Sequence, residues 1–177
     1  YDAEGNQTSV TDPLGNTTSY QYDANGNLTR ITDPLGNVTT YTYDSRGNRL
    51  TETDALGHTT TYSYDLMDRL LSVTDALGNK TTYVYDGNGN RTSETDANGR
   101  TTTYAYDAYN RLIQITDPLG HTTSYTYDSR DNRTRMVDAN GRTTIYTYNI
   151  LDRLIRETNA LGGQTNYTYD AAGNVLT

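Results

Sequence analysis

A 21-residue repeat without insertions or deletions constrains this chain more than any other feature. The dipeptide Tyr-Asp returns every 21 residues from Tyr1-Asp2 to Tyr169-Asp170, with Tyr148-Asn149 as the one variation, so 177 residues hold eight full periods plus nine residues. A fixed period of this length is typical of a repeat array in which each unit packs only on its neighbours. We therefore expect a single array over residues 1–177. Because the sequence starts and ends inside a period, we also expect it to be a segment of a longer array.

Each period contains two turn signals of the form Asp-x-x-Gly. The first turn directly follows the tyrosine, as in residues 23–26. The second turn lies midway between two successive first turns, as residues 12–15 do. Asp at the first position accepts a bond from the backbone N–H two residues on, and Gly at the fourth adopts φ > 0 without a Cβ penalty. Four first turns have Asp or Asn at the Gly position: Asp68, Asn110, Asp131 and Asp152. These residue types best tolerate the left-handed region, so we predict φ > 0 at this position in every turn.

Two strand-like segments lie between the turns of each period, for example residues 27–32 and 37–43. The second segment alternates, so Thr39, Tyr41 and Tyr43 share one face of a strand. This Thr-Tyr-Tyr face is constant in every complete copy while the opposite face varies, and we interpret the constant face as the packed one. The first segment is less regular. Gly or Pro interrupts every stretch before a helical stripe develops, so no helix is expected.

Two chain reversals per period predict an all-β antiparallel meander with two strands per repeat, about sixteen strands in all. With neighbouring strands ~4.8 Å apart, such a sheet would be roughly 75 Å wide, and open sheets of this width curl, split or close. The alternative is a parallel solenoid with 21-residue rungs, in which Tyr41 and Tyr62 would stack one strand spacing apart instead of two. The full reversal made by Asp-x-x-Gly favours the meander.

Composition narrows the function classes. The chain has eighteen Tyr but no Phe, Trp or Cys, which excludes disulfides and thiol chemistry and leaves tyrosine as the main bulky apolar side chain. With a net charge of −8 and no basic patch, nucleic acid is not an expected partner. No apolar run approaches the ~20 residues that a membrane-spanning helix needs.

Few residues are candidates for chemistry. His58 and His121 follow a second-turn Gly, where other copies have Asn, and we interpret both as polar turn-exit residues. Most turns offer one carboxylate and none offers more than two, too few oxygens for the Ca²⁺ site that acidic repeat turns sometimes form. We expect no catalytic residue, no metal ligand and no cofactor, and hence no enzyme. At one position three arginines alternate with leucines (Arg49, Arg91 and Arg133 with Leu28, Leu70, Leu112 and Leu154), which suggests a two-repeat periodicity and cation–π contacts with tyrosines.

The residues that we single out are expected to have structural roles. They are the tyrosines Tyr20, Tyr22, Tyr41, Tyr43, Tyr62, Tyr64, Tyr83, Tyr85, Tyr104, Tyr106, Tyr125, Tyr127, Tyr146 and Tyr148, and the second-turn glycines Gly15, Gly36, Gly57, Gly78, Gly99, Gly120, Gly141 and Gly162. Packing is the favoured role of the tyrosines, since Tyr buries a large area and its hydroxyl can find a partner. Stacking of the regularly spaced rings on sugars is the alternative.

The repeated phrase resembles the YD repeat of Rhs proteins over the whole chain. The residues that carry the resemblance are Tyr-x-Tyr-Asp-x-x-Gly-Asn-Arg/Leu followed by Thr-Asp-Pro/Ala-Leu-Gly-Asn-x-Thr. The resemblance implies strand–turn–strand units in a long sheet that spirals into a hollow shell or tube. In Rhs and Tc-type toxins such a sheet surrounds a C-terminal toxin domain, in teneurins it forms an extracellular barrel, and in wall-associated bacterial proteins it forms a surface or secreted array.

The resemblance implies a non-catalytic function as the structural wall of a shell or tube, secreted or at the cell surface. Such a wall would enclose or display a cargo or a flanking domain. Its expected partners are neighbouring repeats, copies of the chain, and an enclosed toxin domain or surface glycans. The alternative function, from a different class, is an extracellular adhesion or carbohydrate-binding stalk or filament.

Overall fold

The computed structural model describes residues 1–176, which form β-strands joined by turns. The strands are β1 (Ser9–Thr11), β2 (Thr17–Tyr22), β3 (Leu28–Thr32), β4 (Val38–Tyr43), β5 (Arg49–Thr53), β6 (Thr59–Tyr64), β7 (Leu70–Thr74), β8 (Lys80–Tyr85), β9 (Arg91–Thr95), β10 (Thr101–Tyr106), β11 (Leu112–Thr116), β12 (Thr122–Tyr127), β13 (Arg133–Val137), β14 (Thr143–Tyr148), β15 (Leu154–Thr158) and β16 (Gln164–Asn166). This stretch contains no helix, and therefore none long and apolar enough to cross a membrane.

The strand order along the sheet is the order of the strands in the chain, from β1 to β16. Successive strands pair antiparallel, as β3 with β4 and β4 with β5. The predicted all-β meander with two strands per repeat is thereby confirmed. The parallel solenoid is wrong, because an intervening strand separates Tyr41 in β4 from Tyr62 in β6.

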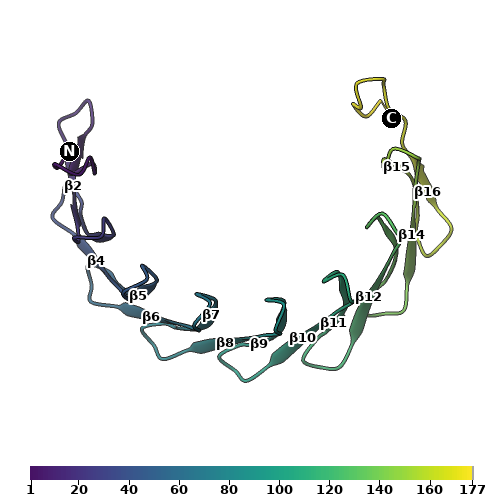
Figure 1. Cartoon of the computed structure of the whole chain (residues 1–177), viewed down its shortest axis with the longest axis horizontal. Coiled ribbons are helices and arrows are strands. Elements are labelled where there is room, and N and C mark those ends of the chain that lie inside the picture. Colours follow the sequence, from purple (N-terminus) through teal and green to yellow (C-terminus); the bar gives the residue numbers. More distant parts are fainter. Residues whose placement is uncertain (177) are drawn as a thin grey trace. The chain divides into compact units, whose positions relative to one another are not determined.

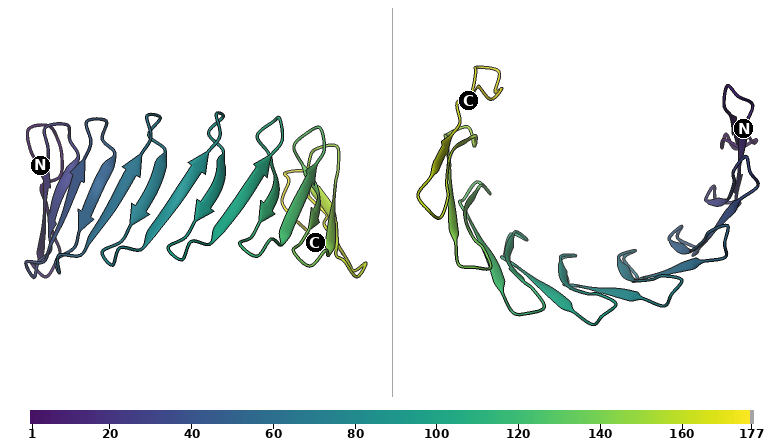
Figure 2. Two further views of the ribbon diagram at one scale, coloured as in Figure 1. Left: turned by 90° about the horizontal axis from the view of Figure 1, so that it is seen from below. Right: turned by 180° about the vertical axis from the view of Figure 1, so that it is seen from behind.

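Contacts divide the chain into two compact units. The first comprises Tyr1–Tyr83 with Asp96–Gly99, and the second comprises Val84–Thr95 and the chain from Arg100 onward. In the first unit β2 to β7 follow one another along a curved sheet, and in the second unit β10 to β15 do the same (Figure 1). Within each unit the first turns lie along one long edge of the sheet and the second turns along the other (Figure 2).

A β-bulge follows the first turn in six of the repeats and explains their irregular segment. Between β4 and β5, Thr42 pairs with Thr51 but Tyr43 pairs with Arg49, so Leu50 is the extra residue. A bulge lets two residues on one strand oppose one on its partner. Residues three apart, such as Arg49 and Glu52, therefore reach the same face of the sheet. Side chains of this five-residue strand therefore do not alternate strictly between the two faces of the sheet. The strict alternation predicted for the six-residue strand does not apply to it.

The turns have the predicted backbone conformation. The fourth turn residue has φ > 0 throughout, as at Gly15 (φ 88°) and at Asp68 (φ 62°), which stands in a Gly position. The turn aspartate accepts the predicted bond: Asp12 Oδ1 lies 2.8 Å from the backbone nitrogen of Leu14 and 2.9 Å from that of Asn16. Its second oxygen accepts a bond of 2.8 Å from the Asn16 side chain. Each turn is thus closed by its own polar side chains.

Burial in this fold is shallow. Among residues 1–176 no hydrophobic side chain is fully buried, and Ser72, at 8% exposure, is the one buried polar residue. The tyrosines of the constant face are half-buried and not enclosed. The face interpreted as packed is therefore packed only by its own cross-strand neighbours within a single layer, without a hydrophobic core.

Candidate functional site on the tyrosine face

Four residues per repeat build one side of the sheet, which we call the tyrosine face. They are the two tyrosines of the six-residue strand and the two residues opposite them across the bulge, for example Tyr41, Tyr43, Arg49 and Glu52. Tyr41 pairs with Glu52 and Tyr43 pairs with Arg49. Cross-strand neighbours of this kind are the unit that stabilises a sheet. All four side chains are half-buried.

The second tyrosine of most repeats donates its hydroxyl to a backbone carbonyl fifteen residues earlier. The bonds join Tyr22 to Gln7 (3.0 Å), Tyr43 to Leu28 (2.8 Å), Tyr106 to Arg91 (3.0 Å), Tyr127 to Leu112 (2.8 Å), Tyr148 to Arg133 (3.1 Å) and Tyr169 to Leu154 (2.7 Å). The paired ladder between β3 and β4 ends at Arg30 and Thr40, so the Leu28 carbonyl lies beyond it. The hydroxyl satisfies this carbonyl where the backbone ladder has stopped. Partial burial also raises the pKa of Tyr43.

The arginines of the tyrosine face lie between tyrosine rings. The guanidinium carbon of Arg49 is 5.7 Å from the ring centre of Tyr41 and 4.8 Å from that of Tyr62. Arg49 also forms an ion pair of 3.0 Å with Glu52. The predicted cation–π contacts are confirmed, and distances of this size are within the range of energetically significant contacts.

The two-repeat alternation now has a physical account. Where the first position is Leu the position three residues later is apolar, as in Leu28 with Ile31, Leu70 with Val73 and Leu112 with Ile115. Where the first position is Arg the later position is Glu, as in Arg49 with Glu52 and Arg91 with Glu94, which form ion pairs of 3.0 Å. The bulge brings both positions to one face of the sheet. In these repeats the two residues are therefore either both apolar or an Arg–Glu ion pair. The last two repeats break this rule with Arg133 and Met136, then Leu154 and Glu157.

The four left-handed Asp and Asn residues link successive first turns. Each accepts a bond from the preceding repeat: Asp68 from Asn48 (2.6 Å), Asn110 from Asn90 (2.8 Å), Asp131 from Arg111 (2.8 Å) and Asp152 from Asn132 (2.8 Å). Gly at the same position has no side chain to make this contact. Sequence reasoning explained why these residues tolerate φ > 0 but missed the bond they form across the repeat.

The histidines belong to the second turns. Nδ1 of His58 is 2.9 Å from Oδ2 of Asp54, and Nδ1 of His121 is 2.8 Å from Oδ2 of Asp117. The imidazole occupies the place of the Asn amide in other turns, which confirms the interpretation as a polar turn-exit residue. The hydrogen bond from His58 is the main cause that lowers the pKa of Asp54.

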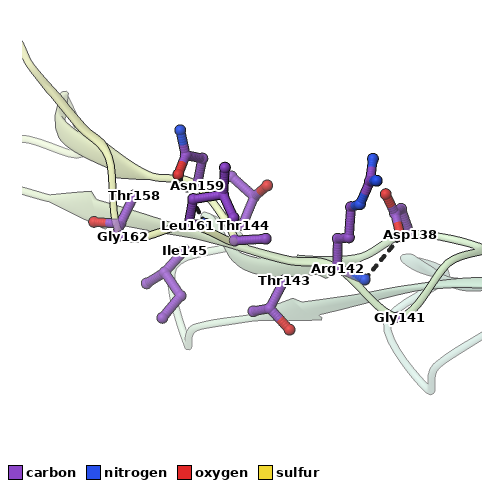
Figure 3. Close-up of a pocket in the computed structure, with 11 residues that line it drawn as sticks. Asp138, Gly141, Arg142, Thr143, Thr144, Ile145, Thr158, Asn159, Leu161 and Gly162 are labelled. Carbon is purple, nitrogen blue, oxygen red and sulfur yellow. Dashed lines mark hydrogen bonds between the residues drawn. The ribbon is translucent and has the colours of Figure 1, made fainter.

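An open hollow of about 920 Å³ lies between two second turns of the second unit (Figure 3). Asp138 and Arg142 line one side, where the Arg142 backbone donates a bond of 2.8 Å to the Asp138 carboxylate. Leu161 and Ile145 line the other side and are 96% and 48% exposed. Its single carboxylate is engaged in capping its own turn. Elsewhere in residues 1–176, no three His, Cys, Asp or Glu side chains gather closely enough to hold a metal ion.

Comparisons with known proteins agree with the repeat. The family model of the RHS repeat matches residues 1–31, 22–59, 48–80, 68–101, 85–122, 106–143, 127–162 and 148–177. These matches extend over the whole chain, so the chain belongs to the RHS repeat family. No curated protein sequence matches it.

Solved structures with a similar fold include two from Tc toxins. A crystal structure of TcdB2-TccC3-TEV is 19% identical, with 94% of this chain and 14% of that chain covered and a TM-score of 0.48. A Photorhabdus luminescens Tc holotoxin pore is 18% identical, with 95% and 14% covered and a TM-score of 0.48. A porin-like protein from Bacteroides uniformis is 17% identical, with 94% and 84% covered and a TM-score of 0.41. The chain thus spans about one seventh of the length of the Tc structures.

Proposed function

We propose that this chain is one uninterrupted array that acts as the structural wall of a shell or tube, enclosing or displaying a cargo or flanking domain. One observation carries the proposal: the strands form one hydrogen-bonded layer, and residues 1–176 build no hydrophobic core. Membership of the RHS repeat family, with the resemblance to Rhs shells, supports it. The wall is proposed to act at the cell surface or outside the cell.

The half-exposed tyrosine face supports a role against another surface. Large exposed apolar patches on a protein surface mark sites of interaction with another molecule. In residues 1–176 these rings are contacted by side chains of the same layer, such as Arg49 beside Tyr41, and not by a second layer of protein. Closing the sheet around a cargo would cover the rings, and so would a second layer of protein.

The proposed wall is non-catalytic, and its tyrosines and second-turn glycines have structural roles. The polar groups of the turns are used to close the turns, as Asp12 and Asp54 are. Activity assays against peptides, glycosides, phosphoesters and nucleic acids should find no turnover by the full chain. Turnover that survives repurification and is lost on replacing one turn residue would contradict this part of the proposal.

Electron cryo-microscopy of the intact protein that carries the array tests the wall directly. We expect strands of this meander to surround a lumen, with density for a cargo inside it or a displayed domain at its mouth. A flat sheet or a solid rod would contradict the proposal. Binding of the full chain to a glycan array, lost in a Tyr41→Ala and Tyr62→Ala variant, would instead support the adhesive alternative.

A further inference from the structure

We propose that Arg133 forms a binding site on the tyrosine face for a carboxylate side chain, Asp or Glu, of a partner protein. The guanidinium carbon of Arg133 is 5.6 Å from the ring centre of Tyr125 and 4.8 Å from that of Tyr146. The side chain is exposed, and its backbone carbonyl accepts the hydroxyl of Tyr148 at 3.1 Å. Packing thus holds the charged group in one place on the surface.

The same arrangement binds a carboxylate elsewhere in this chain. Arg49 lies 5.7 Å and 4.8 Å from its two tyrosine rings, within 0.1 Å of the distances at Arg133, and pairs with Glu52 at 3.0 Å. Arg91 lies 5.0 Å from the ring of Tyr104 and pairs with Glu94 at 3.0 Å. The arrangement of Arg beside tyrosine rings is therefore a carboxylate site in two other repeats.

At Arg133 the internal carboxylate is replaced by a thioether. Met136 pairs with Tyr125 across the sheet in the register in which Glu52 pairs with Tyr41. Within residues 1–176, Arg133 forms no ion pair, and neither does Glu157 of the next repeat. The guanidinium of Arg133 lies beside both rings, and in residues 1–176 its N–H groups donate to no carboxylate.

The surroundings favour a protein side chain as the ligand. A planar guanidinium matches the geometry of a carboxylate with two parallel hydrogen bonds. Met136 beside it offers a flexible apolar contact, which suits the methylene stem of Glu or Asp better than the hydroxyl-rich ring of an acidic sugar. Arg133 would bind such a side chain whether or not the array encloses a lumen.

Nitrogen-15 NMR of the arginine side chains in the full chain tests the site. The probe is a short capped peptide in which Glu alternates with Leu. We expect the Nε–H signal of Arg133 to shift and saturate, while those of Arg49 and Arg91 stay in place. Met136→Glu should supply an internal carboxylate and weaken peptide binding at least about tenfold. Glu52→Met should make Arg49 respond as a second site, and the same spectra report whether each variant is folded.

Three results would overturn the proposal. The first is an Arg133 signal that does not move, and the second is an equal shift of all three arginines, which indicates general charge attraction. The third is unchanged affinity in the Met136→Glu variant. A glucuronate oligosaccharide is titrated in parallel, and its binding more tightly than the peptide at Arg133 would overturn the assignment to a protein side chain.

Discussion

Backbone conformation, and not side-chain packing, determines which residue types occur in the turns. The fourth turn position is left-handed in all repeats, and a Cβ at most of its glycines would meet open space, as at Gly89 (φ 90°). The constraint is therefore conformational and not steric. Asp and Asn are accepted at four of these positions because they tolerate φ > 0, and each then contacts the preceding repeat.

Ala substitutions at the two glycines of one turn should show whether the backbone conformation or the room for a Cβ selects Gly. Gly89→Ala should lower the free energy of unfolding by about 1–2 kcal/mol, because an L-residue with a Cβ is strained at φ > 0. Gly87 lies outside the left-handed region, and a Cβ there also meets nothing within 4 Å. Gly87→Ala should be neutral or stabilise by about 0.4–1 kcal/mol. Urea unfolding followed by tyrosine fluorescence measures both, and equal effects would contradict this account.

Substitutions at Asp68 should show the value of the bond between repeats. Asp68→Ala removes the bond from Asn48 (2.6 Å) and the ion pair with Arg46 (3.1 Å) but keeps φ > 0, so we expect a loss of about 1–2 kcal/mol in the free energy of unfolding. Asp68→Gly loses the same contacts but relieves the strain, and should cost under about 0.5 kcal/mol. In an Asn48→Ala background, Asp68→Ala should lower the free energy of unfolding by a smaller amount. Additive effects in this double-mutant cycle would show that the two side chains do not interact.

The strand pair is the element in which the tyrosine face is built. Where the bulge follows a first turn, it brings positions three apart to one side of the sheet. The tyrosine hydroxyl reaches a carbonyl beyond the end of the ladder to the preceding strand, as Tyr43 reaches Leu28. Each six-residue strand is thereby joined to both of its neighbours. β4, for example, pairs with β5 along its second half. It is joined to β3 by a backbone ladder and by the bond from the Tyr43 hydroxyl. This explains why the second tyrosine is kept as Tyr, since Phe would fill the same space without the donor.

Tyr127→Phe should destabilise the chain by about 1 kcal/mol, because the Leu112 carbonyl loses its 2.8 Å bond while the ring contacts remain. Tyr64→Phe is the matched control, since within residues 1–176 the Tyr64 hydroxyl donates no such bond. Its effect should be within about 0.5 kcal/mol of zero. Hydrogen exchange of the amides near Leu112 should rise only in the first variant. Equal losses from both variants would mean that the hydroxyl bonds contribute nothing specific.

At the scale of the whole array, stability comes from neighbouring strands, since the described part of the chain has no buried hydrophobic core. Contacts between elements in each unit join consecutive strands, as β4 with β5 and β5 with β6. Stability in such arrays is approximately a sum of repeat and nearest-neighbour terms. The same turn chemistry recurs in every repeat, so small contributions from each turn accumulate along the chain.

Acid should therefore destabilise the array in a narrow pH range. The Asn side-chain bond is the main cause that lowers the pKa of turn aspartates such as Asp12, Asp33 and Asp75. A carboxyl with a lowered folded pKa stabilises the fold above its unfolded pKa of about 3.9, and loses that contribution as the pH falls through the folded value. We expect a constant urea midpoint between about pH 7 and pH 5 and a fall below about pH 4.

A turn without a carboxylate provides the control for this pH dependence. Asn159 closes its turn through Oδ1, with bonds of 3.0 Å to the Leu161 backbone nitrogen and 2.9 Å to that of Gly163. An Asp33→Asn variant should keep the equivalent bonds and show a shallower loss of stability in acid. A midpoint that falls between pH 7 and pH 5 would point to groups other than the turn aspartates.

The sequence alone determined the period, the two turns, the left-handed positions and the antiparallel meander, because these follow from rules that act within a few residues. Only the tertiary structure decided which residues share a face after the bulge. The pairing of Arg49 with Glu52, the carbonyl that Tyr43 reaches and the partner of Asp68 all depend on the register between two strands. Register is a property of the strand pair, so the alternation of one strand does not reveal it.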